Sequence, residues 1–200
     1  MCSSDLHGEG LGEHTQIFEH NGEIYDEVMR VPLIVRRPDP SARGERVTAL
    51  VRTLDVAPTV LEWLALPPEP GMQGQSLLAF TAEEEEIRAA AEGPGEILLE
   101  ALRDRQVNPV ELSLLGLRGE GFKAILALDR AGEVKKVELF DLRQDPHENV
   151  DLAPEQPERA KTLRARILAL EQSLPRPQQS NVRELGALES DALRALGYGR

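Results

Sequence analysis

Cysteine, aromatic side chains and long apolar runs are all scarce in this sequence. Cys2 is the single cysteine of the 200 residues, so an internal disulfide is excluded and cysteine usage indicates no redox compartment. Aromatic residues make up only 4%, which leaves Leu, Val, Ile and Ala to build a core. No apolar run approaches the length of about 18 residues that a membrane-spanning helix needs, and no signal-like segment opens the chain. We therefore expect no membrane span, and an export signal of the intact protein would lie outside this sequence.

Acidic residues outnumber basic ones by 35 to 23, and the formal net charge is -12 at pH 7. Such a charge argues against non-specific binding to nucleic acid or to an anionic membrane, because both need clustered Lys and Arg. The hydrophobic fraction of 40% and the charged fraction of 29% are typical of a globular protein. An anionic substrate would have to be attracted by local positive charge or by a metal ion.

The first eighty residues contain patterns of an α/β protein. The run 31–36, Val-Pro-Leu-Ile-Val-Arg, is apolar and β-branched and predicts a buried strand. Asp55 is predicted to cap a helix that has Pro58 in its first turn and that ends at Pro67. Its apolar face comprises Val56, Val60, Leu61 and Leu64.

The second half of the sequence has the pattern of a small antiparallel sheet. Thr81 and Glu84 form a capping box that predicts a short acidic helix up to Gly93. Strand-like segments follow at 97–101, 112–118, 122–128 and 137–142, separated by Gly-containing turns. An amphipathic helix at 157–174 is expected to cover one face of this sheet, and Ser190 to Gly197 predicts a last short helix.

Residues 7–30 are unusually rich in side chains that bind metals and anions. Three of the four histidines, His7, His14 and His20, fall within fourteen positions, among glycines and carboxylates. Imidazole and carboxylate groups suit a divalent cation, and glycine lets the backbone approach closely. On residue types alone, a metal or substrate site and a solvated polar loop both remain open.

Ordered blocks over most of the chain resemble the sulfatase family of the alkaline phosphatase superfamily. The family has Ser-Asp-His-Gly-Glu at the end of a strand, then Leu-Gly-Glu-His, a Lys or His, and Tyr-Asp-Glu before Arg-Val-Pro-Leu-Ile. The matching blocks here are His7 to His14, His20, Tyr25 to Val35, Val51 to Leu61, Met72 to Leu78, Phe122-Lys123, Glu138 to Leu142, Asp145 to Ala153 and Leu193 to Tyr198.

The resemblance implies a cation site at the beginning of this chain. In the family an adjacent Asp-His pair ligates a divalent cation, usually calcium, so His7 would be a metal ligand and Asp5 its nearest Asp candidate. Leu6 separates the two, which departs from the family's adjacent pair. Residues two apart on a strand point the same way, so joint ligation is compatible with the spacing. We also predict that residues 1–6 are a non-native leader, since Cys-Ser-Ser-Asp-Leu is one translation of a common sequencing adapter.

His20 stands where the family places a Lys or His that binds the sulfate and protonates the leaving oxygen. The resemblance therefore makes His20 both a substrate-binding and a catalytic candidate. Cys2 is not the family's nucleophile, because the formylglycine precursor lies in a Cys/Ser-x-Pro/Ala-x-Arg motif and Cys2 to Leu6 has neither Pro nor Arg. We predict structural roles for the Glu13-His14 pair and for a salt bridge of Arg30 with Asp26 or Glu27. Solvent exposure is expected for His147, and packing at the edge of the core for Lys123.

The leading hypothesis is that this chain is a fragment of a sulfuric ester hydrolase, inactive by itself, whose parent acts on a sulfate ester small molecule or glycan. The parent would use calcium and formylglycine and, like many relatives, would be periplasmic or secreted. One alternative is a phosphonate or phosphodiester hydrolase or a phosphoethanolamine transferase of the same superfamily, and another is a noncatalytic acidic interaction module. The upstream nucleophile motif would discriminate between the first two.

The predicted fold class is α/β. Residues 7–80 would be the terminal part of a sulfatase catalytic sheet, 81–95 a helical linker, and 96–200 an antiparallel sheet subdomain with a helical tail. A piece of a larger sheet exposes the faces that its missing strands would cover, so we expect residues 7–80 to carry exposed apolar surface.

Overall fold

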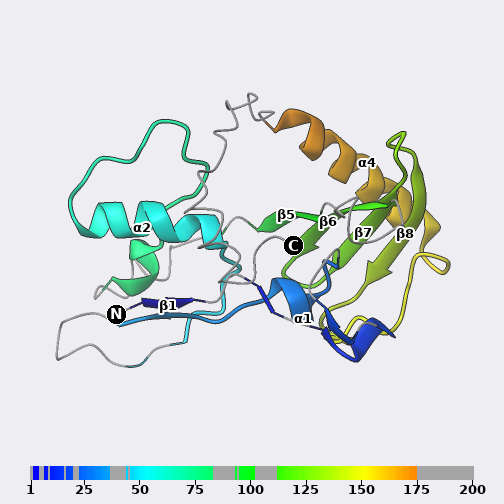
Figure 1. Ribbon diagram of the computed structural model, residues 1–200, viewed down its shortest axis with the longest axis horizontal. Helices are drawn as coiled ribbons and strands as arrows, with labels where there is room; N and C mark the ends of the chain where they lie inside the picture. Colours follow the sequence, from blue (N-terminus) through cyan, green and yellow to red (C-terminus); the bar gives the residue numbers. More distant parts are fainter. Residues whose placement is uncertain are drawn as a thin grey trace, which may run out of the picture.

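The computed structural model describes residues 2–4, 7–8, 10–15, 17–19, 23–36, 44, 46–82, 93, 95–101 and 112–174. Two parts lie side by side in Figure 1, one around helix α2 and one around a four-stranded sheet. The helices predicted to follow Thr81 and to begin at Ser190 fall on residues 83–92 and 175–200, which lie outside the described residues. No helix in the described ranges is long and apolar enough to cross a bilayer.

The predicted antiparallel sheet is present. Its strands follow one another in chain order as β5 (Glu96–Ala101), β6 (Ser113–Gly119), β7 (Lys123–Leu128) and β8 (Val134–Phe140). Every neighbouring pair is antiparallel, with an irregularity in register at Ala127 and Leu128. Strand β8 begins three residues earlier than predicted and ends before Asp141, whose carboxylate accepts hydrogen bonds from the next turn.

Alternation of side chains gives the sheet two buried faces. On one face, α4 (Pro157–Ser173) packs Leu163 and Ile167 against inward-facing residues of β6, β7 and β8, including Leu117, Leu126 and Leu139. On the other face, Ile24 packs with a second set, Leu99, Leu114, Ile125, Ala127 and Phe140. The period of 2 in the strands and the helical period in α4 thus place one apolar set on each side of the sheet. The prediction that the helix covers one face is confirmed.

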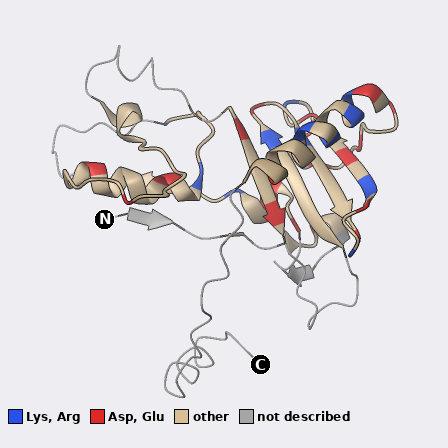
Figure 2. Ribbon diagram, turned by 90° about the horizontal axis from the view of Figure 1, so that it is seen from above, with Lys and Arg blue, Asp and Glu red and all other residues tan. Residues whose placement is uncertain are grey.

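The N-terminal part consists of short elements. Strand β1 (Cys2–Ser4) pairs with β4 (Leu33–Val35), and β2 (Gly10–Leu11) with β3 (Ile17–Glu19), on either side of the 3-10 helix η1 (Glu13–Thr15). Helix α1 (Asp26–Met29) precedes β4. The 3-10 helix η2 (Thr53–Asp55), α2 (Val56–Trp63) and the 3-10 helix η3 (Leu78–Thr81) complete this part. Figure 2 shows charged residues gathered over the sheet and α4, with few around α2.

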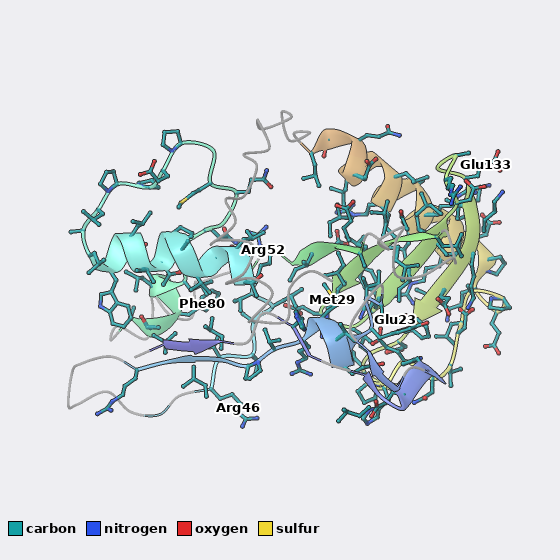
Figure 3. All side chains as sticks on the ribbon, in the orientation of Figure 1. Glu23, Met29, Arg46, Arg52, Phe80 and Glu133 are labelled. Atoms are coloured by element: carbon teal, nitrogen blue, oxygen red, sulfur yellow. The ribbon has the colours of Figure 1, made fainter. Side chains whose placement is uncertain are left out.

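Two local predictions for the N-terminal part were wrong. Segment 31–36 forms the short strand β4, but Ile34 is 65% and Val35 37% exposed, so the strand is not buried. Asp55 stands at the helix start without capping it through its side chain. Its buried carboxylate instead accepts hydrogen bonds from the guanidinium of Arg52 at 2.8 Å and from the backbone of Gln75 at 2.9 Å. Figure 3 shows Arg52 at the N-terminal end of α2.

Exposed apolar side chains are concentrated in the N-terminal part, as predicted. Most of the large exposed apolar residues in the described ranges precede residue 73, among them Leu11, Ile34, Val60, Leu64 and Leu66. In the described part of the chain after residue 73, the large exposed apolar residues are Val150, between β8 and α4, and Leu174, directly after α4. This distribution agrees with elements that belong to a larger α/β layer, because patches of this kind are normally covered in a monomer.

Candidate functional site

Helix α1 lies between segment 7–14, which contains His7 and His14, and the sheet. It has only four residues, and a helix this short has little stability of its own. Acidic residues fill its first turn, and it ends at Met29, followed by the extended Arg30 two residues before Pro32. Ile24 just before it and Val28 within it are buried, so apolar packing fixes the helix on the sheet. The position of α1 is therefore decided by contacts with residues far along the chain.

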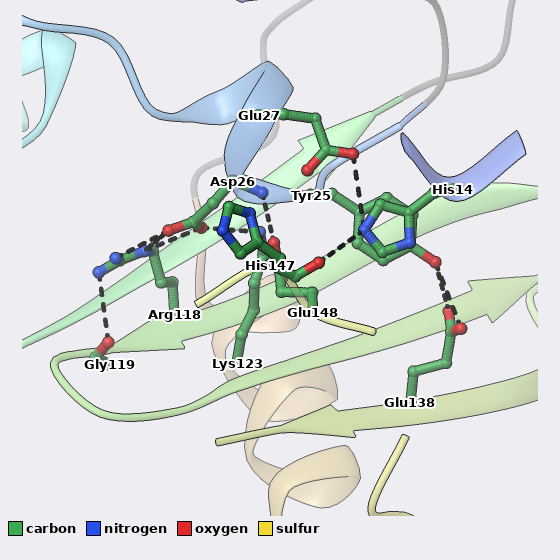
Figure 4. Close-up of polar contacts among 10 residues, drawn as sticks. All are labelled: His14, Tyr25, Asp26, Glu27, Arg118, Gly119, Lys123, Glu138, His147 and Glu148. Atoms are coloured by element: carbon green, nitrogen blue, oxygen red, sulfur yellow. Dashed lines mark hydrogen bonds and ion pairs between the residues drawn. The ribbon is translucent and has the colours of Figure 1, made fainter. Parts of the chain in front are cut away.

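A cluster of four charged side chains anchors α1, two of them buried and two partly buried. The guanidinium of Arg118 donates to both carboxylate oxygens of Asp26, from Nε at 3.0 and 3.1 Å and from Nη2 at 2.9 Å. The ammonium of Lys123 lies 2.9 Å from Oδ1 of Asp26 and 3.0 Å from Oε1 of Glu148. Glu148 in turn accepts the backbone N–H of Asp26 at 2.5 Å through Oε2. Figure 4 shows the four side chains converging from α1, β6, β7 and the turn after β8. We call this set the Asp26 cluster.

The two carboxylates of the Asp26 cluster are shifted in opposite directions. Burial by itself would raise the pKa of Asp26, but the hydrogen bonds from Arg118 and the charge of Lys123 outweigh it, so this pKa is lowered. For Glu148 burial dominates and raises the pKa, and the ammonium of Lys123 offsets only part of that effect. Its Oε1 lies 3.0 Å from that ammonium, and its Oε2 accepts the N–H of Asp26. The cluster combines two acidic and two basic side chains, so its formal charges balance.

His14 connects segment 7–14 to α1 and to Tyr25, the residue before it. Its ring stacks on Tyr25 with centroids 3.7 Å apart and planes 5° from parallel. Its Nε2 lies 3.1 Å from the backbone oxygen of His147 and 3.6 Å from Oε1 of Glu27. The hydroxyl of Tyr25 donates to Glu138, and burial, followed by the charge of Glu138, raises the pKa of Tyr25. Glu13 accepts the N–H of Leu11 at 2.8 Å. These contacts support the structural roles predicted for Glu13 and His14.

His7 lies at the edge of this arrangement. The neighbouring Gly8 donates its N–H to the oxygen of Val28 at 2.7 Å. A Cβ on Gly8 would stand 2.0 Å from the oxygen of Glu27, so only glycine fits this approach to α1. His7 itself is exposed, with Nδ1 3.0 Å from the oxygen of Gly8. The tautomer that donates this hydrogen bond carries its lone pair on Nε2, which is how metal-binding histidines are commonly oriented.

The described residues fit a divalent cation only in part. His7 is an exposed imidazole, which suits one ligand. Within the described ranges, no group of three or more His, Cys, Asp or Glu residues lies close enough together to hold a metal ion. Asp5 and His20, the other predicted site residues, lie outside the described residues. The remaining ligands of a cation beside His7 would thus come from residues other than the described ones.

Other predicted contacts turned out differently. Asp26 pairs with Arg118 and Lys123, and Glu27 lies near His14, so the described ion pairs do not include the predicted pairing of either carboxylate with exposed Arg30. His147 is exposed, as predicted. Lys123 is completely buried rather than at the core edge, because two carboxylates compensate its charge. Arg118 and Glu148 were missed, and the sequence carries no periodic signal for them.

One stretch near the end of the sequence has the letters of the nucleophile motif. Ser190-Asp191-Ala192-Leu193-Arg194 fits Ser-x-Ala-x-Arg. It follows the metal-ligand region instead of preceding it as in the family, and it lies outside the described residues.

The chain is similar to sulfatases over most of its length. Residues 12–173 match the family described as N-sulphoglucosamine sulphohydrolase, C-terminal. Arylsulfatase K of Gallus gallus is 32% identical over 163 residues, which cover 82% of this chain and 29% of that protein. The multifunctional alkaline phosphatase superfamily protein PehA of Trinickia caryophylli is 30% identical over 158 residues, covering 74% and 29%.

The fold of the chain is similar to part of a solved hydrolase structure. The crystal structure of phosphonate monoester hydrolase from Agrobacterium radiobacter superposes with a TM-score of 0.64 at 24% identity, over 84% of this chain and 34% of that one. The chain thus spans less than a third of the length of the curated relatives named above. The family that it matches is described as the C-terminal part of a sulphohydrolase. The chain therefore belongs to the sulfatase family of the alkaline phosphatase superfamily.

Proposed function

We propose that the protein to which this chain corresponds hydrolyses sulfate esters, and that this chain supplies part of the cation and substrate site. The observation that carries the proposal is the match of residues 12–173 to the C-terminal region of a sulphohydrolase family. The substrate class is a sulfate ester of a small molecule or glycan. Two relatives are named for substrates of this class: arylsulfatase K, and the N-acetylglucosamine-6-O-sulfatase of Bacteroides thetaiotaomicron.

In this proposal His7 and Asp5 hold a divalent cation, calcium by family analogy, which would offset the negative charge of sulfate oxygens. The exposed imidazole of His7 and its hydrogen bond to Gly8 support this role. His20 hydrogen-bonds the sulfate and donates a proton to the leaving oxygen, because an alkoxide is a poor leaving group until it is protonated. Formylglycine, formed upstream of the region matched here, would supply the nucleophile.

The leaving group of the substrate provides the test of His20. The intact protein, its His20→Ala variant and a His147→Ala control should be assayed on sulfate esters with leaving groups of low and high pKa. Loss of a general acid should slow esters of poor leaving groups by about 10²–10⁴-fold, and activated aryl sulfates much less. His147→Ala, which removes an exposed imidazole, should leave both rates unchanged. Equal slowing of both ester classes by His20→Ala would assign His20 to binding alone.

The proposed division of the site has its own test. The 200-residue chain, with and without Ser190→Ala, should release no product from 4-nitrophenyl sulfate, whereas the intact protein should do so. In the intact protein, His7→Ala should raise the calcium concentration needed for half-maximal activity. Turnover by the isolated chain that Ser190→Ala abolishes would place the nucleophile in the tail and refute the proposed division.

A second candidate is hydrolysis of phosphonate monoesters or phosphodiesters. The similarity to PehA and the superposition on a phosphonate monoester hydrolase support it. The intact protein should therefore also be given 4-nitrophenyl phenylphosphonate and bis(4-nitrophenyl) phosphate. A kcat/KM higher for either than for 4-nitrophenyl sulfate would favour this candidate. Failure to hydrolyse any of the three would favour a noncatalytic module.

A further inference from the structure

We propose that Lys123 is a positioning residue, which sets the place of the segment 7–14 by holding α1 on the sheet through Asp26 and Glu148. The proposal rests on the proposed function only in assigning His7 to the site that is positioned. Lys123 is completely buried on the C-terminal sheet and acts through the carboxylates that it contacts.

The first step is that α1 holds segment 7–14 at both ends. Gly8 donates to Val28 at 2.7 Å and lies too close to Glu27 for any side chain. At the other end, His14 stacks on Tyr25 at 3.7 Å. Since both ends contact α1 or the residue preceding it, a displacement of α1 must displace His7 as well.

The second step is that Lys123 is the link between the two carboxylates that hold α1. Its Nζ is 2.9 Å from Asp26 in α1 and 3.0 Å from Glu148, which in turn accepts the N–H of Asp26. Arg118 contacts only Asp26 of this pair. Without Lys123, two carboxylates would share a buried site with one guanidinium, and their repulsion would push Asp26 and Glu148 apart. Glu148 also has a φ of 54°, which a non-glycine residue rarely adopts, so the turn is held in this conformation by its contacts.

The third step separates positioning from general stability. The sheet has an apolar core on each face, and the Asp26 cluster lies on the face with Ile24, away from α4. A substitution in the α4 core, such as Ile167→Ala, should destabilise the fold without changing the geometry of segment 7–14. If Lys123 only stabilised the fold, its replacement would change the geometry of segment 7–14 no more than Ile167→Ala does.

The experiment uses nuclear magnetic resonance on the 200-residue chain. Two signals report on the segment: amide exchange of Gly8, whose N–H is bonded to Val28, and the upfield shift of the His14 ring protons that stacking on Tyr25 produces. Lys123→Met should speed Gly8 exchange by about tenfold or more and move the His14 signals towards those of an unstacked ring. Ile167→Ala, compared under conditions of equal global stability, should leave the His14 shifts unchanged and Gly8 exchange within about twofold.

Asp26→Asn provides a second variant should Lys123→Met not fold. It keeps the shape of the side chain but removes the charge that both cations contact, and it should loosen the same two signals. Its matched control is Asp151→Asn, because Asp151 accepts the N–H groups of Leu139 and Ala153, which both lie outside α1. Unchanged His14 shifts in Asp26→Asn, or equal changes in Asp151→Asn, would overturn the proposal. Neither signal needs turnover, so the failure of sulfate hydrolysis and the failure of positioning give different results.

Discussion

The ammonium of Lys123 lies 3.0 Å from the carboxylate of Glu148, and both side chains are completely buried. The two residues come from β7 and from the turn after β8, and they meet beneath Asp26. A charge in this position is tolerated only with its partners present, because an unpaired buried ion loses its hydration without compensation. The effects of single substitutions in the Asp26 cluster follow from this requirement.

Loss of the buried Lys123 ammonium should lower the free energy of unfolding far more than loss of an exposed ammonium. Lys123→Met should lower the free energy of unfolding by about 3–5 kcal/mol, because two buried carboxylates then lose their shared cation. Lys135→Met removes a lysine that is 47% exposed yet also contacts two carboxylates, and it should cost at most about 1 kcal/mol. Urea unfolding followed by circular dichroism measures both values. Similar losses for the two variants would contradict the burial of Lys123.

The two acids of the Asp26 cluster should give opposite pH dependences. The pKa of Asp26 is lowered, so its contribution to stability is present above the ordinary Asp pKa of about 3.9 and is lost as the pH falls through its lower folded value. The pKa of Glu148 is raised, so stability increases as the pH falls through that raised value to the ordinary Glu pKa of about 4.3.

Urea midpoints measured from pH 3 to pH 8 test these signs. Glu148→Gln should remove the gain in stability seen on mild acidification, and Asp26→Asn should remove part of the loss at the acidic end. Asp129→Asn is a useful comparison, because this carboxyl also has a lowered pKa, caused first by its hydrogen bond with Lys135, but it lies on the surface. A wild-type profile that Glu148→Gln leaves unaltered would be incompatible with the raised pKa of Glu148.

Gly8→Ala should destabilise the contact between segment 7–14 and α1. The added methyl group would meet the backbone oxygen of Glu27 at 2.0 Å, and overpacking of this kind costs about 1–3 kcal/mol. Gly44→Ala is the matched control, because nothing described lies within 4 Å of its added Cβ, and it should change stability by no more than about 0.5 kcal/mol. Thermal unfolding of the two variants measures the difference.

Thr59 should contribute to stability through its hydroxyl group. It donates to the oxygen of Asp55 at 2.5 Å and accepts the N–H of Leu77 at 2.9 Å, in a buried position. Thr59→Val keeps the shape but leaves the buried N–H of Leu77 without its partner, which costs about 1–3 kcal/mol. Thr59→Ser retains both hydrogen bonds and should cost less. Equal urea midpoints for the two variants would show that the hydroxyl contributes nothing.

The exposed apolar surface of the N-terminal part should bind hydrophobic dyes and promote self-association. Ile34 is 65% and Leu64 64% exposed, and the double variant Ile34→Gln/Leu64→Gln should reduce fluorescence of an anilinonaphthalene sulfonate dye. Val150→Gln removes a side chain that is 55% exposed but lies on the other part, and should have little effect. A cooperative melt with low dye binding in the wild-type chain would oppose this prediction.

The sequence by itself determined the elements of the C-terminal sheet and α4, because periods of 2 and 3.6 in apolar residues state which face is buried. Local pattern was insufficient for β4 and Asp55. Whether β4 is buried depends on what packs against it, which the residues of the strand do not determine. The Asp55 carboxylate accepts a hydrogen bond from Gln75, twenty positions away.

The Asp26 cluster was decided only by the tertiary structure. Asp26 lies 92 positions from Arg118, 97 from Lys123 and 122 from Glu148, and no periodicity connects residues so far apart. A charged residue in a strand looks like a solvated one until the fold brings its counterions to it. Resemblance to a family marked His7, Asp5 and His20 as site candidates, whereas the contacts that fix α1 against the sheet could be identified only from the folded chain.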